Sequence, residues 1–250
     1  AAMRAALAVD VMTTARTPEG RTRARPVVDG WVLTDTARAI FEGGRQHRVP
    51  VMVGWNADEG SLAVGRTPTD VAAYQTWARD TFGDKANAFL ELYGGDTPST
   101  AREAFLKAYS DQNFGWEMRE WARLMGNVNQ PAFLYHFSRV PPASTTGVYH
   151  GAEIRYVFDN LYAPGAQHEY TLLDGWVSGL MASYWVAFAT TGNPNTADTP
   201  PWLAYTSLRH ELLDFGDTGV HRFDFRKAEL DFFDHYYAES ADADHDEDDQ

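Results

Sequence analysis

The chain has 250 residues, with 21 Lys and Arg against 35 Asp and Glu, a formal net charge of −14 and no cysteine. This acidic balance disfavours nucleic acid and anionic membrane surfaces, so we expect neither as a partner. Without cysteine there is no disulfide, thiolate metal site or cysteine nucleophile. No apolar run approaches the roughly 18 residues of a membrane helix. Six of the eight histidines show no ligand spacing, and we expect no metal and no cofactor.

The two ends of the chain differ in character. Residues 1–7 lack the cleavage pattern of a signal peptide and resemble a helix entered midway, so we expect that something precedes this chain in its gene. The sequence therefore does not predict the cellular compartment, because any signal peptide would lie in that preceding part. Residues 240–250 carry six acidic residues and predict a solvated, disordered tail, which leaves 1–239 as part of a single domain.

The first half of the chain is mostly helical in pattern. Val71, Tyr74 and Ala78 recur at helical spacing, and Thr100 with Glu103 predicts a capping box. The predicted elements, in order, are a helix over 1–12, an exposed loop over 13–25, a helix over 35–42, a buried strand over 49–54 and helices between 69 and 126.

The second half adds one more buried strand and a hairpin. Pro131 starts the strand and Pro141-Pro142 follow it. The predicted elements are a strand over 132–138, a long helix over 173–190, a terminal hairpin from 211–215 and 220–223, and a last helix over 226–237. Two buried strands leave unpaired edges, so we expect residues outside this chain to complete the sheet.

Two loops carry the residue types of acid–base chemistry. Glu59 follows the strand over 49–54, and His150 lies between small residues after the strand over 132–138. The carboxyl ends of strands define the crevice of an open α/β sheet, so both side chains are expected to face it. An acid that precedes a histidine is also the order found in the α/β-hydrolase triad.

Five segments in the same order carry a family resemblance. They are Pro26–Gly30, Gly54–Ser61, Phe133–Ser138, His150–Phe158 and Trp185–Asn195. Together they resemble the C-terminal half of a type B carboxylesterase, the cholinesterase-like branch of the α/β-hydrolases. The resemblance implies an α/β fold that contains the last central strands, flanking helices and terminal hairpin of that fold, with an N-terminal half outside this chain.

The resemblance also implies roles for individual residues. Glu59 would be the triad acid and His150 the general base, which takes a proton from a serine hydroxyl and passes it to the leaving alcohol. Asp58, Ser61 and Glu153 are expected to support them. Glu153 has an equal alternative as a helix cap or a solvated carboxylate.

The nucleophile is where this sequence departs from the family pattern. No serine stands in Gly-x-Ser-x-Gly, and Ser178 in Gly175–Gly179 is one place too late and on a predicted helix. The oxyanion-hole loop is missing as well. We therefore expect the chain to be inactive alone, with serine and oxyanion hole supplied by an N-terminal half as a separate chain or nicked fragment.

The substrate is predicted only as a small-molecule carboxylic ester. Leu62, Ala63 and Val64 stand where cholinesterases carry aromatic residues for a cationic head group, so choline recognition loses its support. Leu62, Ala63, Tyr149 and Phe158 are the candidates to line an apolar pocket.

Plainer interpretations compete with these roles. His150 would merely cap the next helix, and Glu59 would be a surface carboxylate replaced by Asp58 as the acid. His136 stands inside an apolar strand and is expected to be a core residue, with a role in catalysis as the alternative. For the whole chain, the lack of a nucleophile leaves two alternatives to the enzyme. They are a catalytically inactive cholinesterase-like binding or adhesion domain, and an independent α+β module with accidental motifs. The presence of both Glu59 and His150 favours the enzyme, because an inactive relative has no chemical reason to keep either residue.

Overall fold

The computed structural model describes residues 6–14, 26–162, 169–218 and 220–247 of the chain. It divides the protein into two compact units, 1–45 and 46–250. In the first unit, helix α2 spans Ala8–Thr14 and helix α3 spans Ala37–Glu42. Helix α3 agrees with its prediction, and the Thr36 hydroxyl caps it by accepting from the Ala39 amide. Part of the predicted helix over 1–12 and most of the loop over 13–25 lie outside the described residues.

The second unit is built on a four-stranded sheet. Its strands are β1 (Val51–Asn56), β2 (Ala132–Phe137), β3 (Leu212–Phe215) and β4 (Val220–Arg222), in that spatial order. Strands β1, β2 and β3 run parallel, and β4 returns antiparallel to β3. Both buried strands and the terminal hairpin are therefore confirmed, with β1 displaced two residues toward the carboxyl end. The parallel register pairs Asn56 with Phe137, so β1 and β2 end together.

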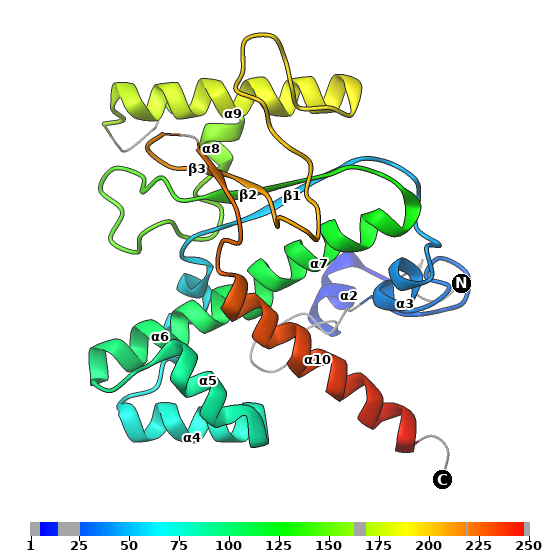
Figure 1. The fold of residues 1–250 in the computed structure, drawn as a ribbon, viewed down its shortest axis with the longest axis vertical. Coiled ribbons are helices and arrows are strands. Elements are labelled where there is room, and N and C mark those ends of the chain that lie inside the picture. The colour runs from blue at the N-terminus through cyan, green and yellow to red at the C-terminus, as the bar shows by residue number, and fades with distance from the viewer. Residues whose placement is uncertain (1–5, 15–25, 163–168, 219, 248–250) are drawn as a thin grey trace. The chain divides into compact units, whose positions relative to one another are not determined.

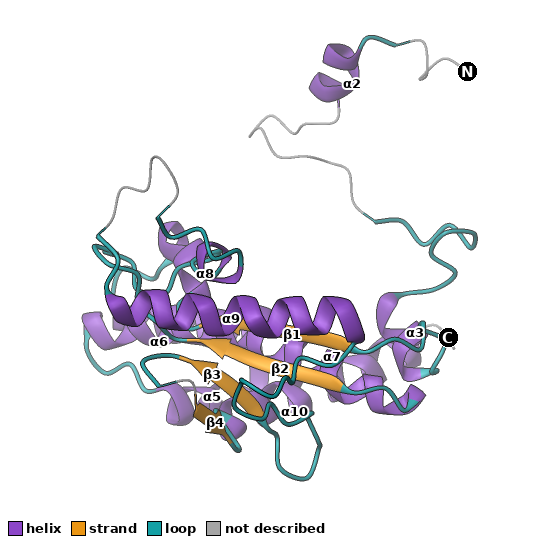
Figure 2. Ribbon diagram, turned by 90° about the horizontal axis from the view of Figure 1, so that it is seen from above, coloured by secondary structure: helices purple, strands orange, loops and turns teal. Residues whose placement is uncertain are grey.

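Helices cover both faces of this sheet (Figures 1 and 2). Helices α8 (Ile154–Val157) and α9 (Leu172–Thr191) lie on one face, and α7 (Trp116–Leu124) and α10 (Lys227–Glu247) lie on the other. The first face holds an aromatic core that includes Phe133, Phe137, Tyr156, Tyr184, Trp202 and Phe215. Burial on both faces explains why β2 is a nearly unbroken apolar run.

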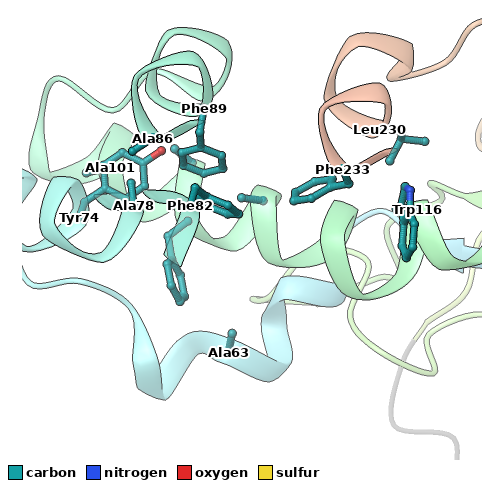
Figure 3. Close-up of a cluster of buried hydrophobic side chains, with 13 residues drawn as sticks. Ala63, Tyr74, Ala78, Phe82, Ala86, Phe89, Ala101, Trp116, Leu230 and Phe233 are labelled. Atoms are coloured by element: carbon teal, nitrogen blue, oxygen red, sulfur yellow. The ribbon is translucent and has the colours of Figure 1, made fainter. Parts of the chain in front are cut away.

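A second core holds the helices that follow β1. Its residues come from η1 (Glu59–Arg66), α4 (Val71–Phe82), α5 (Ala86–Tyr93) and α6 (Pro98–Ser110), with further residues of α7 and α10. The turn η2 (Gly83–Lys85) links α4 to α5, the π-helical turn η3 (Asp111–Gly115) links α6 to α7, and η4 (Met125–Val128) follows α7. Tyr74, Phe82 and Phe89 belong to this core together with Phe233 of α10 (Figure 3). The cluster also buries Ala63 of η1 and so fixes η1, which begins at Glu59.

The capping box of α6 lies three residues earlier than predicted. Thr97 is the N-cap, its hydroxyl accepts from the Thr100 amide, and the Thr100 hydroxyl accepts from the Thr97 amide. Pro98 occupies the first turn, where its missing N–H is harmless. The box of Thr100 with Glu103 was therefore wrong, because Pro98 already starts the helix.

The acidic tail also differs from its prediction. Helix α10 continues to Glu247, so residues 240–247 are helical. Alanines at 238, 241 and 243 favour helix, and extension of an existing helix needs no new nucleus. Residues 248–250 lie outside the described part of the chain. The extent of the single domain stays a prediction.

The sheet is a partial one. Among the described strands, β1 pairs only with β2, so its other edge has no neighbouring strand. A small mixed sheet with flanking helices is what part of an α/β-hydrolase would contain. None of the described helices is long and apolar enough to cross a membrane.

Candidate active site

Glu59 lies at the carboxyl end of β1 with its carboxylate turned inward. Only 4% of the residue is exposed. Its Oε1 accepts from the Asn56 amide at 3.0 Å, which closes a tight turn after the strand. The next residue must be glycine, since a Cβ on Gly60 would stand 2.1 Å from the Leu106 carbonyl oxygen of α6. The strand end and α6 together fix the acid.

Burial governs the electrostatics of Glu59. It raises the pKa of the carboxyl above its ordinary value, and the negative charge of Glu153 acts in the same direction. Hydrogen bonds from the Asn56 amide and from His150 oppose this rise. At this buried position the ionised form of Glu59 therefore depends on hydrogen bonds from its neighbours.

The histidine loop is tied to the turn that carries Glu59. Asp58 Oδ2 accepts from the Val148 amide at 2.7 Å, and the Asp58 amide donates to the Val148 carbonyl at 3.1 Å. Gly147 adopts φ +67°, and a Cβ there would stand 2.1 Å from Asp58 Oδ2. The loop approaches Asp58 this closely only because residue 147 is glycine.

Glu59 and His150 meet directly. His150 Nδ1 lies 2.6 Å from Glu59 Oε2, although 91 residues separate them in sequence. When Glu59 is ionised its carboxylate can only accept, so in a neutral imidazole Nδ1 carries the hydrogen and Nε2 has the lone pair. The His150 side chain is 53% exposed, and its ring packs 5.6 Å from the ring of Phe114. This is the geometry of an acid that orients a base.

The predicted supporting residues surround this pair. Ser61 Oγ accepts from the His150 backbone amide at 3.3 Å, and Asp58 holds the loop as described above. Glu153 makes no capping hydrogen bond at the start of α8, and its Oε2 instead accepts from Asn56 Nδ2 at 2.5 Å. The plain capping role of Glu153 is therefore not observed.

Asn56 was missed by the sequence interpretation. It is 1% exposed, and its Nδ2 also donates to the Tyr149 carbonyl oxygen at 3.0 Å. Its place at the end of an apolar strand is the signal that was available, because a buried amide there requires partners. Ser110, whose Oγ accepts from the Gly60 amide at 2.7 Å, gave no such signal.

The four candidate pocket residues do not share one environment. Leu62, Tyr149 and Phe158 are 51%, 37% and 72% exposed, so they are accessible, and their contact with substrate stays a prediction. Ala63 is fully buried in the helical core (Figure 3), where it cannot contact a substrate. The motif alone does not reveal that this residue of η1 points inward.

A cavity of about 460 Å³ lies beside the support residues rather than beside these four. Asp58, Ser61 and Ser110 line it together with Arg102 and Lys107 of α6. Neither Glu59 nor His150 lines it.

Other polar residues have structural roles. His136 is 5% exposed, with Nδ1 3.0 Å from Asp214 Oδ1 and its ring against Trp55, so it is a core residue of β2. Ser178 is buried in α9 and donates to the Tyr156 carbonyl oxygen at 3.0 Å. Among the described residues no group of three or more His, Asp or Glu has the arrangement to hold a metal.

The partial sheet and the acid–histidine pair at its strand ends define the chain as part of an α/β-hydrolase. A comparison with known families identifies it further. The profile of the Carboxylesterase family matches residues 3–233, so the chain belongs to the carboxylesterase family.

Individual relatives agree with this assignment. The chain is 29% identical to Fumonisin B1 esterase of Sphingopyxis macrogoltabida, over 76% of this chain and 36% of that protein. It is 26% identical to Cholinesterase of Mus musculus, over 75% and 35%, and 30% identical to Carboxylesterase 1C of Rattus norvegicus, over 72% and 36%. The chain thus spans about a third of the length of these relatives, which is consistent with a C-terminal half.

Proposed function

We propose that this chain is the acid-and-base part of a serine esterase that hydrolyses carboxylic esters. The observation that carries the proposal is the 2.6 Å contact between His150 Nδ1 and Glu59 Oε2, in which the His150 side chain is 53% exposed. The names of the relatives, which share ester hydrolysis, support the reaction class.

The reaction follows from the roles that the pair can fill. His150 Nε2 takes the proton from a serine hydroxyl as the oxygen attacks the ester carbonyl, and then gives it to the leaving alcohol. A water repeats the sequence and releases the acid. Glu59 holds the imidazole in the Nδ1–H form and stabilises the imidazolium. General-base assistance of this kind contributes about 10²–10⁴-fold.

The nucleophile is proposed to lie outside this sequence. The chain contains no Gly-x-Ser-x-Gly. The hydroxyl of Ser61 accepts a hydrogen bond from the His150 backbone amide, whereas a nucleophilic serine donates its proton to the imidazole. A separate chain, a nicked fragment or a preceding segment would bring the serine and the oxyanion-hole amides to the exposed side of His150. The open edge of β1 in the described sheet is available for pairing with a further strand.

Denaturing mass spectrometry of purified, active material tests the proposal. We expect a companion polypeptide, or a longer precursor, that contains Gly-x-Ser-x-Gly, together with hydrolysis of p-nitrophenyl acetate. A single species of 28.0 kDa that turns over this ester through its own acyl-enzyme would refute the divided site.

A further inference from the structure

Asn56 joins the acid and the base of the proposed esterase site. As the last residue of β1, it donates its backbone amide to Glu59 Oε1 at 3.0 Å and leaves Oε2 for His150. Its side-chain Nδ2 reaches the Tyr149 carbonyl oxygen at 3.0 Å and Glu153 Oε2 at 2.5 Å. These two acceptors flank His150 in sequence.

The orientation of the Asn56 amide is fixed by its surroundings. A flipped side chain would place Oδ1 against a carbonyl oxygen and a carboxylate, neither of which can donate when Glu153 is ionised. In the observed orientation Oδ1 is buried without a hydrogen-bond partner among the described residues. A lone buried acceptor is unfavourable. The two hydrogen bonds donated by Asn56 Nδ2 therefore have to offset the unfavourable burial of Oδ1.

We propose that Asn56 is a positioning residue that holds the His150 loop on both sides of the imidazole and so keeps Nδ1 on Glu59. Its role rests on the proposed esterase function, in which Nε2 must point at the serine. The tie from Asp58 to Val148 restrains the loop only on the side before His150. Asn56 adds the restraint at Tyr149 and the restraint beyond the histidine, at Glu153.

The tautomer of His150 in the assembled protein tests this role without any turnover. Long-range ¹H–¹⁵N spectra distinguish the two neutral forms of an imidazole. We expect wild type to show the Nδ1–H form alone, and Asn56→Ala to show a mixture of the Nδ1–H and Nε2–H forms. Asn56→Ser, whose hydroxyl is too short to reach both acceptors, should behave in the same way if the alanine variant does not fold.

Asn195 offers a matched control. Its Nδ2 donates to the Trp202 carbonyl oxygen at 3.0 Å, so Asn195→Ala also removes a part-buried loop tie. This variant should lose thermal stability and keep the single Nδ1–H form. A single Nδ1–H form in folded Asn56→Ala or Asn56→Ser would overturn the proposal.

A second readout uses the assembled esterase. Turnover by Asn56→Ala should fall about 10²-fold, as expected for a misplaced catalytic group, while Asn195→Ala keeps wild-type turnover. Wild-type turnover by Asn56→Ala would contradict the positioning role. If the wild-type assembly has no esterase activity, the proposed function fails and the tautomer result still decides the role of Asn56.

Discussion

At the scale of single residues, the central feature is a buried acid that holds an exposed base. Glu59 is almost inaccessible, whereas half of the His150 side chain is open. Such an arrangement keeps the carboxylate dry and leaves the imidazole free to exchange protons. The division of exposure between the two residues therefore matches the roles proposed for them.

Replacement of the base should separate catalysis from folding. We expect His150→Ala to reduce p-nitrophenyl acetate turnover of the assembled enzyme by at least about 10²-fold, because general-base assistance is lost. Its far-ultraviolet circular dichroism should match wild type, since the exposed side chain supports little of the core. Unchanged turnover in this variant would refute the assignment of the base.

The burial of Glu59 also predicts a pH-dependent stability. Because the pKa of Glu59 is raised in the folded chain, the folded state binds its proton more tightly than the unfolded state does. Stability from this group is thus present below the ordinary pKa value of 4.5 and declines as pH rises through the raised folded pKa. Glu59→Gln should remove that decline.

Urea unfolding of both proteins across this range measures the difference. We expect wild type to lose stability relative to Glu59→Gln as pH rises from 4.5 toward neutrality. A wild type that instead gains on the variant as pH rises would show that the partners of Glu59 outweigh its burial.

At the scale of elements, the site depends on the loop that carries His150, and this loop is fixed where Gly147 and Val148 contact Asp58. Gly147→Ala combines a left-handed φ with a Cβ 2.1 Å from Asp58 Oδ2, so we expect it to destabilise the chain by about 1–3 kcal/mol. Gly126→Ala is the matched control, because a Cβ there meets nothing within 4 Å. Equal melting temperatures for the two variants would contradict this account of the loop.

A buried ion pair fixes the π-helical turn that carries Phe114. Arg226 and Asp111 are 13% and 2% exposed at their side chains, and Tyr93 donates to the same carboxylate at 2.7 Å. We expect Arg226→Met to cost about 3–5 kcal/mol, because the buried Asp111 carboxylate loses its ion-pair partner and keeps only the Tyr93 hydrogen bond. Thermal or urea unfolding measures this cost.

The exposed pair of Lys227 with Asp231 provides the comparison for that variant. Lys227→Ala should change the free energy of unfolding by no more than about 1 kcal/mol. An equal loss of unfolding free energy in Arg226→Met and Lys227→Ala would show that burial does not make the Asp111 pair more important for stability.

The elements predicted best from sequence are those whose patterns are long or sharply delimited. Strand β2 and the terminal hairpin follow from apolar runs between prolines and glycines. Helix α9 follows from Trp176, Leu180, Tyr184 and Phe188, which recur every four residues. The capping box was misplaced because Thr97 and Thr100 carry equivalent hydroxyls. Pro98, which favours the first helical turn, is the local signal that marks Thr97 rather than Thr100 as the N-cap.

The candidate site was predictable only in part. Motif order identified Glu59 and His150, and the structure brings them together. It did not identify Asn56, whose partners lie 93 and 97 residues away, or the inward direction of Ala63. The apolar strand indicates that Asn56 is buried, but the partners of Asn56 and the inward direction of Ala63 depend on long-range packing, which a local pattern does not show.

At the scale of the whole molecule, an acid and a base are present on a sheet whose described strands leave one edge open. The chain spans about 36% of Fumonisin B1 esterase and carries no Gly-x-Ser-x-Gly. We therefore propose a catalytic triad divided between this sequence and residues outside it. If the triad is divided, the covalent acyl intermediate forms on a serine outside these 250 residues.

Labelling with a fluorophosphonate, followed by mass spectrometry of the separated peptides, tests this claim most directly. We predict that the label attaches to a serine in a Gly-x-Ser-x-Gly peptide outside these 250 residues, and that His150→Ala slows the labelling. A label on a serine of this chain, at an unchanged rate in His150→Ala, would contradict the account.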